Sequence, residues 1–468
     1  MDRTGVRFGT SGIRGPVVQM TDETCYAYVM AFMQAIASDA DKVILGHDLR
    51  PSSPRIAAAC AAAIKDTGRE PLYVGSLPTP AVACFASWMQ APAIVITGSH
   101  IPYDRNGIKF YRAEGEISKA DEEAISAATV DLPDSIALPA LPEAFPLARQ
   151  AYVRRYVDFF GAGTLSGLTV AVYEHSSVAR DILREVLQAL DAKVVSLGRT
   201  DVFVPIDTEA VRAEDVEQAR AWASEHRFDA LVSTDGDADR PLIADEKGSW
   251  LRGDIVGLLC AQFLKAQVVV TPVSSNTAAE RSGSFMKVLR TRIGSPYVIE
   301  AMTAAVAKGQ AGVVGYEANG GLLLGSAVGR HGKALSALPT RDALLPILSL
   351  LCLMKENNCR MSELTRDLPR RFTASDRLQN IPPEKSRAFI DSLKNDAGLL
   401  AKVCAAGADS ILHIDETDGL RVTFASQLIV HLRPSGNAPE LRCYTEADSM
   451  EQATSVCESC LKNVLAAL

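Results

Sequence analysis

The sequence lacks an apolar run long enough to cross a lipid bilayer. Its longest apolar stretch, Ala343 to Met354, is interrupted by Pro346 and falls short of the roughly 20 residues that a spanning helix needs. That stretch predicts a buried helix, and no membrane partner is expected. The first residues, Met-Asp-Arg-Thr-Gly, also lack the apolar segment of a secretory signal, so we expect a cytoplasmic protein.

The sequence also lacks an excess of basic residues. It has 48 lysines and arginines against 56 aspartates and glutamates, which gives a formal net charge of −8. Because an acidic chain without a basic stripe binds nucleic acid poorly, no nucleic-acid partner is expected. An anionic ligand has to be held by a few local cations.

A disulfide framework is missing as well. The ten cysteines are scattered, mostly inside apolar runs such as residues 57–64, which suits buried and reduced thiols. Cys457 and Cys460 have the spacing of a redox or zinc motif, but no second pair and no nearby histidine accompanies them. We interpret this pair as part of the packing of a helix.

The chain does contain a repeated alternation of strands and helices. At 468 residues, 47% hydrophobic and 22% charged, it is globular and long enough for three or four domains. Three times a β-branched strand leads through a polar loop to a helix, and a later strand ends in an unusual loop. The first strands cover residues 43–48, 168–174 and 267–272, and their later partners cover 93–100, 229–237 and 311–317. This pattern predicts α/β domains whose loops meet at one cleft, because ligands bind beyond the carboxyl ends of such strands.

Turn-rich segments separate these units. Proline-dense residues 133–146 follow the first unit, residues 245–253 follow the second, and the chain changes character again at residues 369–383. We therefore predict four domains, which span residues 1–146, 147–248, 249–368 and 369–468.

The first unusual loop contains Ser99. Gly98 lacks a Cβ and so lets a bulky group approach the backbone, while His100 and Lys109 supply an imidazole and an ammonium that can activate a hydroxyl nucleophile. The Asn-Gly pair at residues 106–107 predicts a tight turn with positive φ. An ordinary loop whose polar side chains only face water is the alternative interpretation.

The second loop places Asp235, Asp237 and Asp239 at alternate positions directly after a buried strand. Such carboxylates repel one another unless a cation lies among them, so a divalent metal is expected. The spacing begins like that of a calcium-binding EF-hand, but Arg240 replaces the turn glycine and strands flank the loop. A loop of the haloacid dehalogenase type, in which Asp235 itself is phosphorylated, remains an alternative.

Three further loops carry groups suited to oxyanions or sugar hydroxyls. Residues 8–15 surround Arg14 with glycines and hydroxyls, which suits phosphate. Residues 315–321 carry Glu317 on a glycine-rich turn, where it can accept from sugar hydroxyls. Residues 433–444 combine two arginines with a serine on a proline-fixed loop, as expected of a phosphate-binding cradle.

The serine loop resembles the phosphoserine loop of the α-D-phosphohexomutases, usually written Ala-Ser-His-Asn-Pro. Gly98 and Ile101 depart from that motif, whereas the matching residues are Ser99, His100, Pro102, Asn106, Gly107 and Lys109. Four further family motifs occur in the family's order: Gly-Thr-Ser-Gly-x-Arg-Gly, Asp-Gly-Asp-x-Asp-Arg, Gly-Glu-x-Ser-Gly-His and Arg-Pro-Ser-Gly-Thr-Glu-Pro. The resemblance covers the chain from Phe8 to Glu446.

The resemblance implies an architecture of three similar α/β domains and a C-terminal α+β domain around a central cleft. It also implies an isomerase in which phosphorylated Ser99 interconverts hexose 1-phosphates and 6-phosphates through a bisphosphate intermediate. Mg²⁺ is the expected cofactor, and glucose 1,6-bisphosphate or mannose 1,6-bisphosphate the expected activator. We expect a monomer or a homodimer.

The matching positions receive their roles from the family's motifs. The expected catalytic residues are Ser99, His100, Lys109, Arg14 and Arg240, and the expected metal ligands are Ser99, Asp235, Asp237 and Asp239. The expected substrate-binding residues are Glu317, Asn319, Arg433, Ser435, Gly436, Asn437 and Arg442.

The sugar loop departs most from the family. Asn319 replaces a serine, and Gly321 replaces a histidine that helps proton transfer in relatives, a role for which His100 or His331 is a conjectured substitute. Because Glu317 can accept from hydroxyls of either sugar, we predict phosphomannomutase activity together with some phosphoglucomutase activity. Glucosamine phosphate is expected to react more weakly, since no extra carboxylate for its ammonium is evident. The alternatives are a phosphoglucomutase or phosphoglucosamine mutase and, more remotely, a sugar-phosphate phosphatase or a non-enzymatic sensor.

Overall fold

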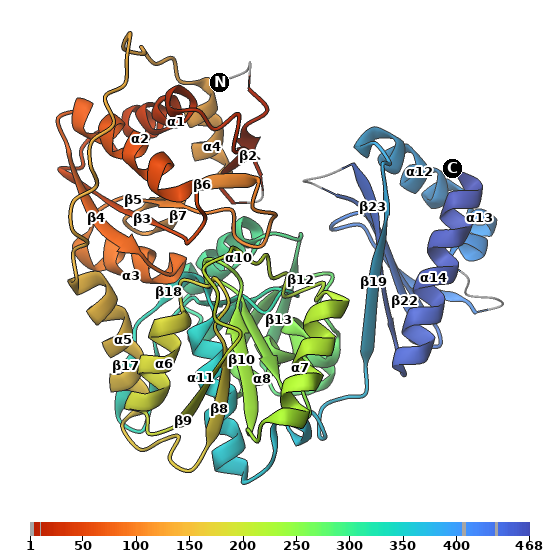
Figure 1. Ribbon diagram of the computed structural model, residues 1–468. Helices are drawn as coiled ribbons and strands as arrows, with labels where there is room; N and C mark the ends of the chain where they lie inside the picture. The colour runs from red at the N-terminus through yellow and green to blue at the C-terminus, as the bar shows by residue number, and fades with distance from the viewer. Residues whose placement is uncertain (1–3, 10, 405–408, 436–438) are drawn as a thin grey trace.

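The computed structural model describes residues 4–9, 11–404, 409–435 and 439–468. Four large sheets follow one another along the chain, and each is covered by helices (Figure 1). The fourth, blue in Figure 1, stands to one side of the other three. This arrangement agrees with the predicted α/β architecture.

The first two sheets lie in the N-terminal half. The strands and helices around the first sheet are β1 (Arg7–Phe8), β2 (Ile13–Pro16), α1 (Asp22–Ala35), β3 (Lys42–His47), α2 (Ser53–Asp66), β4 (Glu70–Ser76), α3 (Thr79–Met89), β5 (Ala93–Ile96), β6 (Arg105–Arg112), β7 (Gly115–Glu116) and α4 (Lys119–Ala127). Those around the second are α5 (Leu147–Phe160), β8 (Thr169–Tyr173), α6 (Arg180–Ala189), β9 (Lys193–Leu197), α7 (Ala213–Glu225), β10 (Ala230–Thr234) and β11 (Pro241–Ala244).

The other two sheets lie in the C-terminal half. Around the third sheet are α8 (Gly253–Phe263), β12 (Val268–Pro272), α9 (Ala278–Arg281), β13 (Lys287–Thr291), α10 (Ser295–Ala307), β14 (Val313–Tyr316), β15 (Leu322–Leu324), the hairpin of β16 (Val328–Arg330) and β17 (Lys333–Leu335), β18 (Leu338–Asp342), α11 (Leu344–Asn357) and the 3₁₀ helix η1 (Met361–Glu363). Around the fourth are β19 (Phe372–Gln379), α12 (Pro383–Asn395), α13 (Ala397–Val403), β20 (Ile411–Asp415), β21 (Leu420–Phe424), β22 (Ile429–Pro434), β23 (Glu440–Ala447) and α14 (Met450–Ala467).

The first three sheets repeat one arrangement, as the sequence predicted. Each contains three parallel strands in the order β4-β3-β5, β9-β8-β10 or β13-β12-β14, and the last of the three pairs with an antiparallel strand, β6, β11 or β15. The unusual loops all occupy the same place in this repeat, between the last parallel strand and its antiparallel neighbour. Parallel strands end at the same edge of a sheet, so each domain presents one such loop at its carboxyl edge.

The fourth sheet is antiparallel throughout, in the order β19-β23-β22-β21-β20. Helices α12, α13 and α14 pack on it and form a hydrophobic core separate from the rest. The first three domains instead share one continuous core, to which Ile44, Val170 and Val269 all belong.

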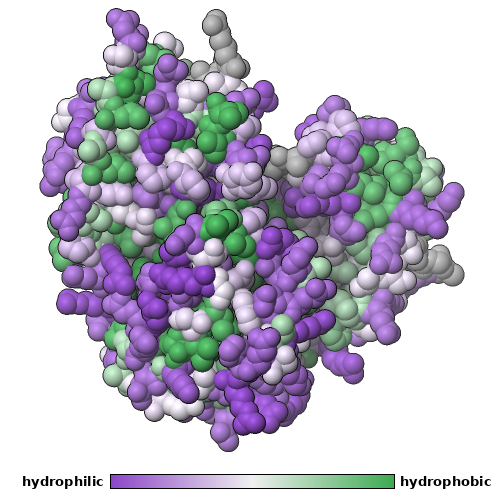
Figure 2. All heavy atoms as spheres, in the orientation of Figure 1, coloured by the Kyte–Doolittle hydropathy of each residue, from purple (hydrophilic) through white to green (hydrophobic). Residues whose placement is uncertain are grey.

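Two expectations about buried segments are confirmed. The apolar stretch at residues 343–354 lies in α11 and is almost entirely buried. Cys457 and Cys460 are buried in α14, and all ten cysteines are free. Among the described residues no helix is both long and apolar enough to cross a membrane, and Figure 2 shows mostly hydrophilic side chains on one face.

The expected tight turn at residues 106–107 is wrong. Asn106 and Gly107 lie inside β6, where they pair with Gly15 and Arg14 of β2. A Cβ on Gly107 would lie 2.5 Å from the carbonyl oxygen of Ile13, so the glycine serves a close approach of strands. The sheet pairing overrides the local preference of the Asn-Gly pair. Residues 128–146 contain no helix or strand, and the four domain boundaries stay predictions.

Candidate active site

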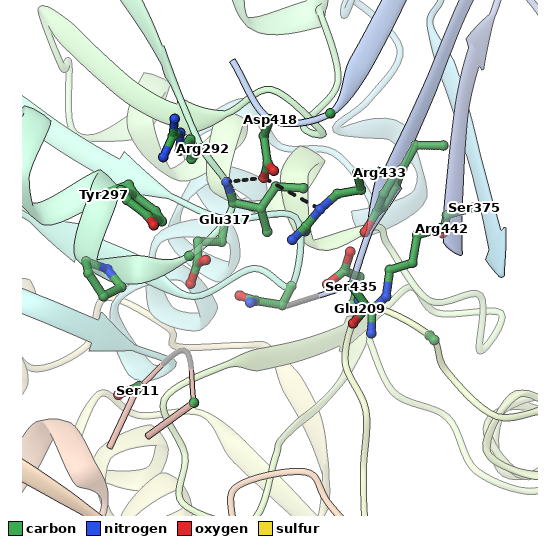
Figure 3. A pocket seen from close by; sticks show the side chains of 18 of the residues that line it. Ser11, Glu209, Arg292, Tyr297, Glu317, Ser375, Asp418, Arg433, Ser435 and Arg442 are labelled. Atoms are coloured by element: carbon green, nitrogen blue, oxygen red, sulfur yellow. Dashed lines mark hydrogen bonds and ion pairs between the residues drawn. The ribbon is translucent and has the colours of Figure 1, made fainter. Parts of the chain in front are cut away.

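The serine loop, the aspartate loop and the sugar loop meet the fourth domain at one cavity of about 760 Å³. Its lining includes Arg14 and His100 of the first domain, Glu209 and Arg240 of the second, Glu317, Asn319 and Arg341 of the third, and Arg433, Ser435 and Arg442 of the fourth. Figure 3 shows Arg433 and Arg442 on one side of this cavity and Tyr297 and Glu317 on the other. Residues far apart in the sequence are thus brought together, as the shared cleft required.

Ser99 lies in the loop after β5, three residues beyond the end of the strand, and is fully buried. Its backbone adopts a φ of +54°, in the left-handed region that a non-glycine residue rarely occupies. The amide N–H donates to Thr97 Oγ1 at 2.8 Å, and the hydroxyl donates to Asp235 Oδ2 at 2.7 Å. His100 Nδ1 lies 3.3 Å from the same hydroxyl. The predicted serine, imidazole and aspartate loop therefore form one contact network.

The aspartate loop after β10 can hold a metal ion. Ligand oxygens of Asp235, Asp237 and Asp239 lie within 4.8 Å of one another, and all three side chains are buried. Lys109 Nζ contacts Oδ2 of both Asp237 and Asp239 at 2.7 Å. Within the described part of the chain, Oδ1 of Asp237 and Oδ1 of Asp239 accept no hydrogen bond. Asp239 Oδ1 has only an ion pair with Arg240 Nε at 3.5 Å. Two buried carboxylate oxygens that accept no hydrogen bond fit a divalent cation, because such ions prefer oxygen ligands.

The electrostatics of this loop also favour a cation. Burial and the charges of Asp237 and Asp239 raise the pKa of Asp235 well above its usual value. Asp239 shows the opposite behaviour: although burial acts to raise its pKa, the charges of Arg341, Lys109 and Arg240 lower it. A bound divalent ion would favour the ionised form of all three carboxylates.

Three arginines close to this loop, Arg14, Arg240 and Arg341, line the cavity. Burial and the charges of Arg240 and Arg341 lower the pKa of Arg14 to about 10. Burial and the charges of Arg240 and Arg14 lower the pKa of His100 well below its usual value, and Arg240 Nη1 donates to His100 Nδ1 at 2.9 Å. Cations that repel one another in this way are expected where an anionic group binds.

The fourth domain presents its arginines from the opposite side. Arg433 Nε lies 3.6 Å from Asp418 Oδ2, and Arg442 Nη2 lies 3.3 Å from Glu440 Oε2. Ser435 lines the cavity beside them. Gly436 and Asn437, which the sequence assigned to the same cradle, lie outside the described residues.

Comparison with known proteins identifies the family. Residues 5–132, 150–248 and 252–372 match the models of Phosphoglucomutase/phosphomannomutase, alpha/beta/alpha domains I, II and III, and residues 357–462 match the C-terminal domain of the same proteins. The chain belongs to the phosphoglucomutase/phosphomannomutase family.

Individual relatives agree with this membership. The chain is 46% identical over 468 residues to a phosphomannomutase of Salmonella muenchen, covering 99% of this chain and 96% of that one. A solved structure of a phosphoglucomutase/phosphomannomutase family protein from Burkholderia thailandensis has a TM-score of 0.76 at 20% identity, covering 98% and 97% of the two chains. Aspergillus fumigatus N-acetylphosphoglucosamine mutase, solved in complex with GlcNAc-6P and magnesium, has a TM-score of 0.62 at 14% identity, covering 98% and 96%.

This member of the phosphoglucomutase/phosphomannomutase family uses a buried arginine that sequence reasoning missed. Arg50 donates to the backbone oxygens of Ser99, Ile101, Pro102 and Arg105, and its Nε donates to Asp48. Its guanidinium also fills the space beside Gly98, where a Cβ would lie 2.5 Å from Cζ. The bulky group that the missing Cβ admits is therefore Arg50. Its place just after β3, at the carboxyl edge of the sheet, is the signal that could have found it.

Two other groups were missed. Arg341, in β18, contacts Asp239 and Glu317, and the polar run Thr340-Arg341-Asp342 directly before apolar α11 was the only hint of it. Asp207 and Glu209, in the segment between β9 and α7, line the cavity although no motif marks them. His331 lies in the turn between β16 and β17, and it does not line the site cavity.

Proposed function

We propose that this family member is a phosphomannomutase that works through phosphorylated Ser99. The Ser99 phosphoester bond breaks as a free hydroxyl of mannose 1-phosphate takes the phosphoryl group, which yields mannose 1,6-bisphosphate and the free serine. The proton of the attacking hydroxyl passes to a base of the site, and the serine oxygen takes up a proton as its bond to phosphorus breaks. The bisphosphate then reorients within the cavity and returns its other phosphoryl group to Ser99, so that mannose 6-phosphate leaves.

A single observation carries this proposal. The buried Ser99 hydroxyl lies 2.7 Å from Asp235 Oδ2, and the neighbouring His100 lines the same cavity as Arg433 and Arg442 of the fourth domain. A site that transfers phosphate at one end needs a second anion site at the other, because the intermediate carries two phosphates. The 46% identity to a phosphomannomutase supports mannose as the sugar.

The residues around Ser99 have three roles in this reaction: metal binding, charge neutralisation and proton transfer. Asp235, Asp237 and Asp239 would hold Mg²⁺ together with the phosphate on Ser99, and the bound ion would neutralise charge on the transferring group. Arg14, Lys109 and Arg240 add positive charge at the same place, as a preorganised electrostatic site requires. His100, 3.3 Å from the serine hydroxyl, moves the proton.

The rest of the site positions the sugar. Glu317 and Asn319 bind its hydroxyls, and the phosphate that does not react is held by Arg433, Ser435, Gly436, Asn437 and Arg442. Glucose 1,6-bisphosphate or mannose 1,6-bisphosphate serves as activator because either can phosphorylate a serine that has lost its phosphate. Asp207 and Glu209 line the same cavity, and these two carboxylates favour phosphoglucosamine mutase activity as the second candidate function.

The test is turnover of three 1-phosphates, those of mannose, glucose and glucosamine, with Mg²⁺ and glucose 1,6-bisphosphate. We expect mannose 6-phosphate as product, a lower kcat/KM with glucose 1-phosphate and the lowest with glucosamine 1-phosphate. An acid-stable phosphate should map to Ser99, and Ser99→Ala should abolish turnover. Release of free phosphate, a hydroxylamine-labile phosphate on Asp235, or a preference of about tenfold (about 1.4 kcal/mol) for glucosamine phosphate would contradict the proposal.

A further inference from the structure

Arg341 joins two loops of the site that come from different domains. Its side chain is only 2% exposed. Nε and Nη2 donate to Asp239 Oδ2 at 3.1 and 2.8 Å, and Nη1 donates to Glu317 Oε2 at 3.0 Å. One guanidinium therefore bridges the aspartate loop of the second domain and the sugar loop of the third.

The guanidinium of Arg341 has donors to spare. An arginine has five N–H donors, and those of Arg50 are all directed at Asp48 and at four backbone oxygens. Arg341 instead directs three at carboxylates, so that one N–H on each terminal nitrogen makes no hydrogen bond with any residue that the structure describes. Because Arg341 also lines the cavity, these two donors can reach a ligand there.

The stem of Arg341 occupies the space beside Gly321. A Cβ on Gly321 would lie 2.6 Å from Cδ and 2.9 Å from Cγ of Arg341, distances that real Cβ atoms do not tolerate. Any side chain at position 321 would therefore collide with the arginine. A histidine at position 321 and Arg341 in its present conformation therefore exclude each other.

We propose that Arg341 is a substrate-binding residue of this enzyme and takes the place of the sugar-loop histidine. Its two spare N–H groups donate to the sugar phosphate at the end where the phosphoryl group is transferred. Its bridge to Glu317 fixes the carboxylate that binds the sugar hydroxyls. This inference rests on the proposed function for the identity of the ligand, but not for the place where it binds.

The test compares the affinities for glucose 1,6-bisphosphate and for Mn²⁺. If Arg341 only held the fold together, its loss would weaken the binding of both ligands. In a Ser99→Ala background, which blocks turnover, Arg341→Met should raise the Kd for glucose 1,6-bisphosphate at least about tenfold, since a charged hydrogen bond is lost. The Kd for Mn²⁺ should fall, because a positive charge beside Asp239 is removed. Titration calorimetry measures the first and electron paramagnetic resonance the second. An unchanged bisphosphate Kd, or weaker binding of both ligands, would overturn the proposal.

Two further variants keep the test decisive if Arg341→Met folds poorly. Arg341→Lys retains the charge and N–H donors on a single nitrogen but loses the planar guanidinium, so its bisphosphate Kd should lie between those of the wild-type residue and the methionine variant. Gly321→His alone should collide with Arg341 and weaken bisphosphate binding, whereas Gly321→His with Arg341→Ala should recover part of the loss. Equal effects of Gly321→His with and without Arg341 would contradict the shared-space argument.

A matched control separates stability from binding. Arg330→Met removes an arginine that packs on Phe263 and pairs with Glu356 at another cavity, so it should lower the thermal midpoint without changing the bisphosphate Kd. A wild-type enzyme inactive on all three 1-phosphates would refute the proposed function, yet the binding comparison would still decide the role of Arg341. A change of the bisphosphate Kd in Arg330→Met as large as in Arg341→Met would overturn the inference.

Discussion

At the scale of single residues, the site is held together by buried charges whose partners come from different domains. Lys109 of the first domain contacts two aspartates of the second, and Arg341 of the third contacts one of them. Breaking such a pair on one side leaves an uncompensated buried charge, which typically costs about 3–5 kcal/mol. Single substitutions here should therefore affect chemistry and domain docking together.

Asp237 offers the clearest test at this scale. Thr79 Oγ1 and Lys109 Nζ both donate to its Oδ2, at 2.6 and 2.7 Å, which leaves Oδ1 for a metal. Asp237→Asn removes one negative charge, so we expect weaker Mg²⁺ binding and a lower kcat together. Metal titrations of activity measure both.

A control for this variant lies nearby in the same domain. Asp245 is also buried, but it accepts backbone N–H groups of a turn after β11. Asp245→Asn changes the charge equally and should leave the Mg²⁺ dependence of activity unchanged. Activity of Asp237→Asn that is insensitive to chelators would refute the assigned metal loop.

At the scale of elements, helix α8 supports the sugar loop from behind. Its first residue, Gly253, lies so close to that loop that a Cβ would come within 2.3 Å of the Gly320 nitrogen and 2.5 Å of the Ala318 oxygen. The contacted atoms are backbone and cannot move aside without shifting the loop. The position of Glu317 thus depends on the absence of one methyl group in a helix.

Gly253→Ala tests this dependence. A better helix former at an ordinary helix position would stabilise α8, but here the methyl group would displace the sugar loop, so we expect a KM for mannose 1-phosphate several-fold higher and a lower thermal midpoint. Gly329→Ala in β16 is the control, because its nearest contact would be an ordinary 3.8 Å. An unchanged KM in Gly253→Ala would show that the loop does not rely on α8.

At the scale of the whole molecule, the first three domains share one core and the fourth has its own. We therefore expect two folding units, and we expect acid to lower the free energy of unfolding of each. His175 and His431 are buried, one in each unit, and the Nε2–H of each donates a hydrogen bond to a backbone oxygen, that of Thr234 or of Asp418. Burial lowers the pKa of both to about 4. Their neutral forms therefore belong to the folded state.

Acid should destabilise both units. Between about pH 6.5 and pH 4 the unfolded chain binds a proton at each histidine that the folded chain does not, so stability falls as the pH falls, by up to about 3 kcal/mol for each group. Chemical denaturation at pH 7 and pH 5 measures the loss. His431→Gln should weaken the pH dependence of the fourth domain's transition, whereas His413→Gln, which changes an exposed histidine, should not. Equal unfolding free energies at the two pH values would contradict this expectation.

The sequence by itself determined the elements and most of the loops that carry chemistry. Runs of β-branched residues specify buried strands locally, and polar loops at their ends can be recognised without knowing the fold, which is why Ser99 and the three aspartates could be proposed from the sequence. Tertiary structure decided the rest. Arg50 and Arg341 contact residues far along the chain. The Asn106-Gly107 pair lies in a strand because β2 pairs with it, and a Cβ on Gly321 would collide with Arg341. Contacts between distant segments depend on how the domains pack, and no local pattern encodes that packing.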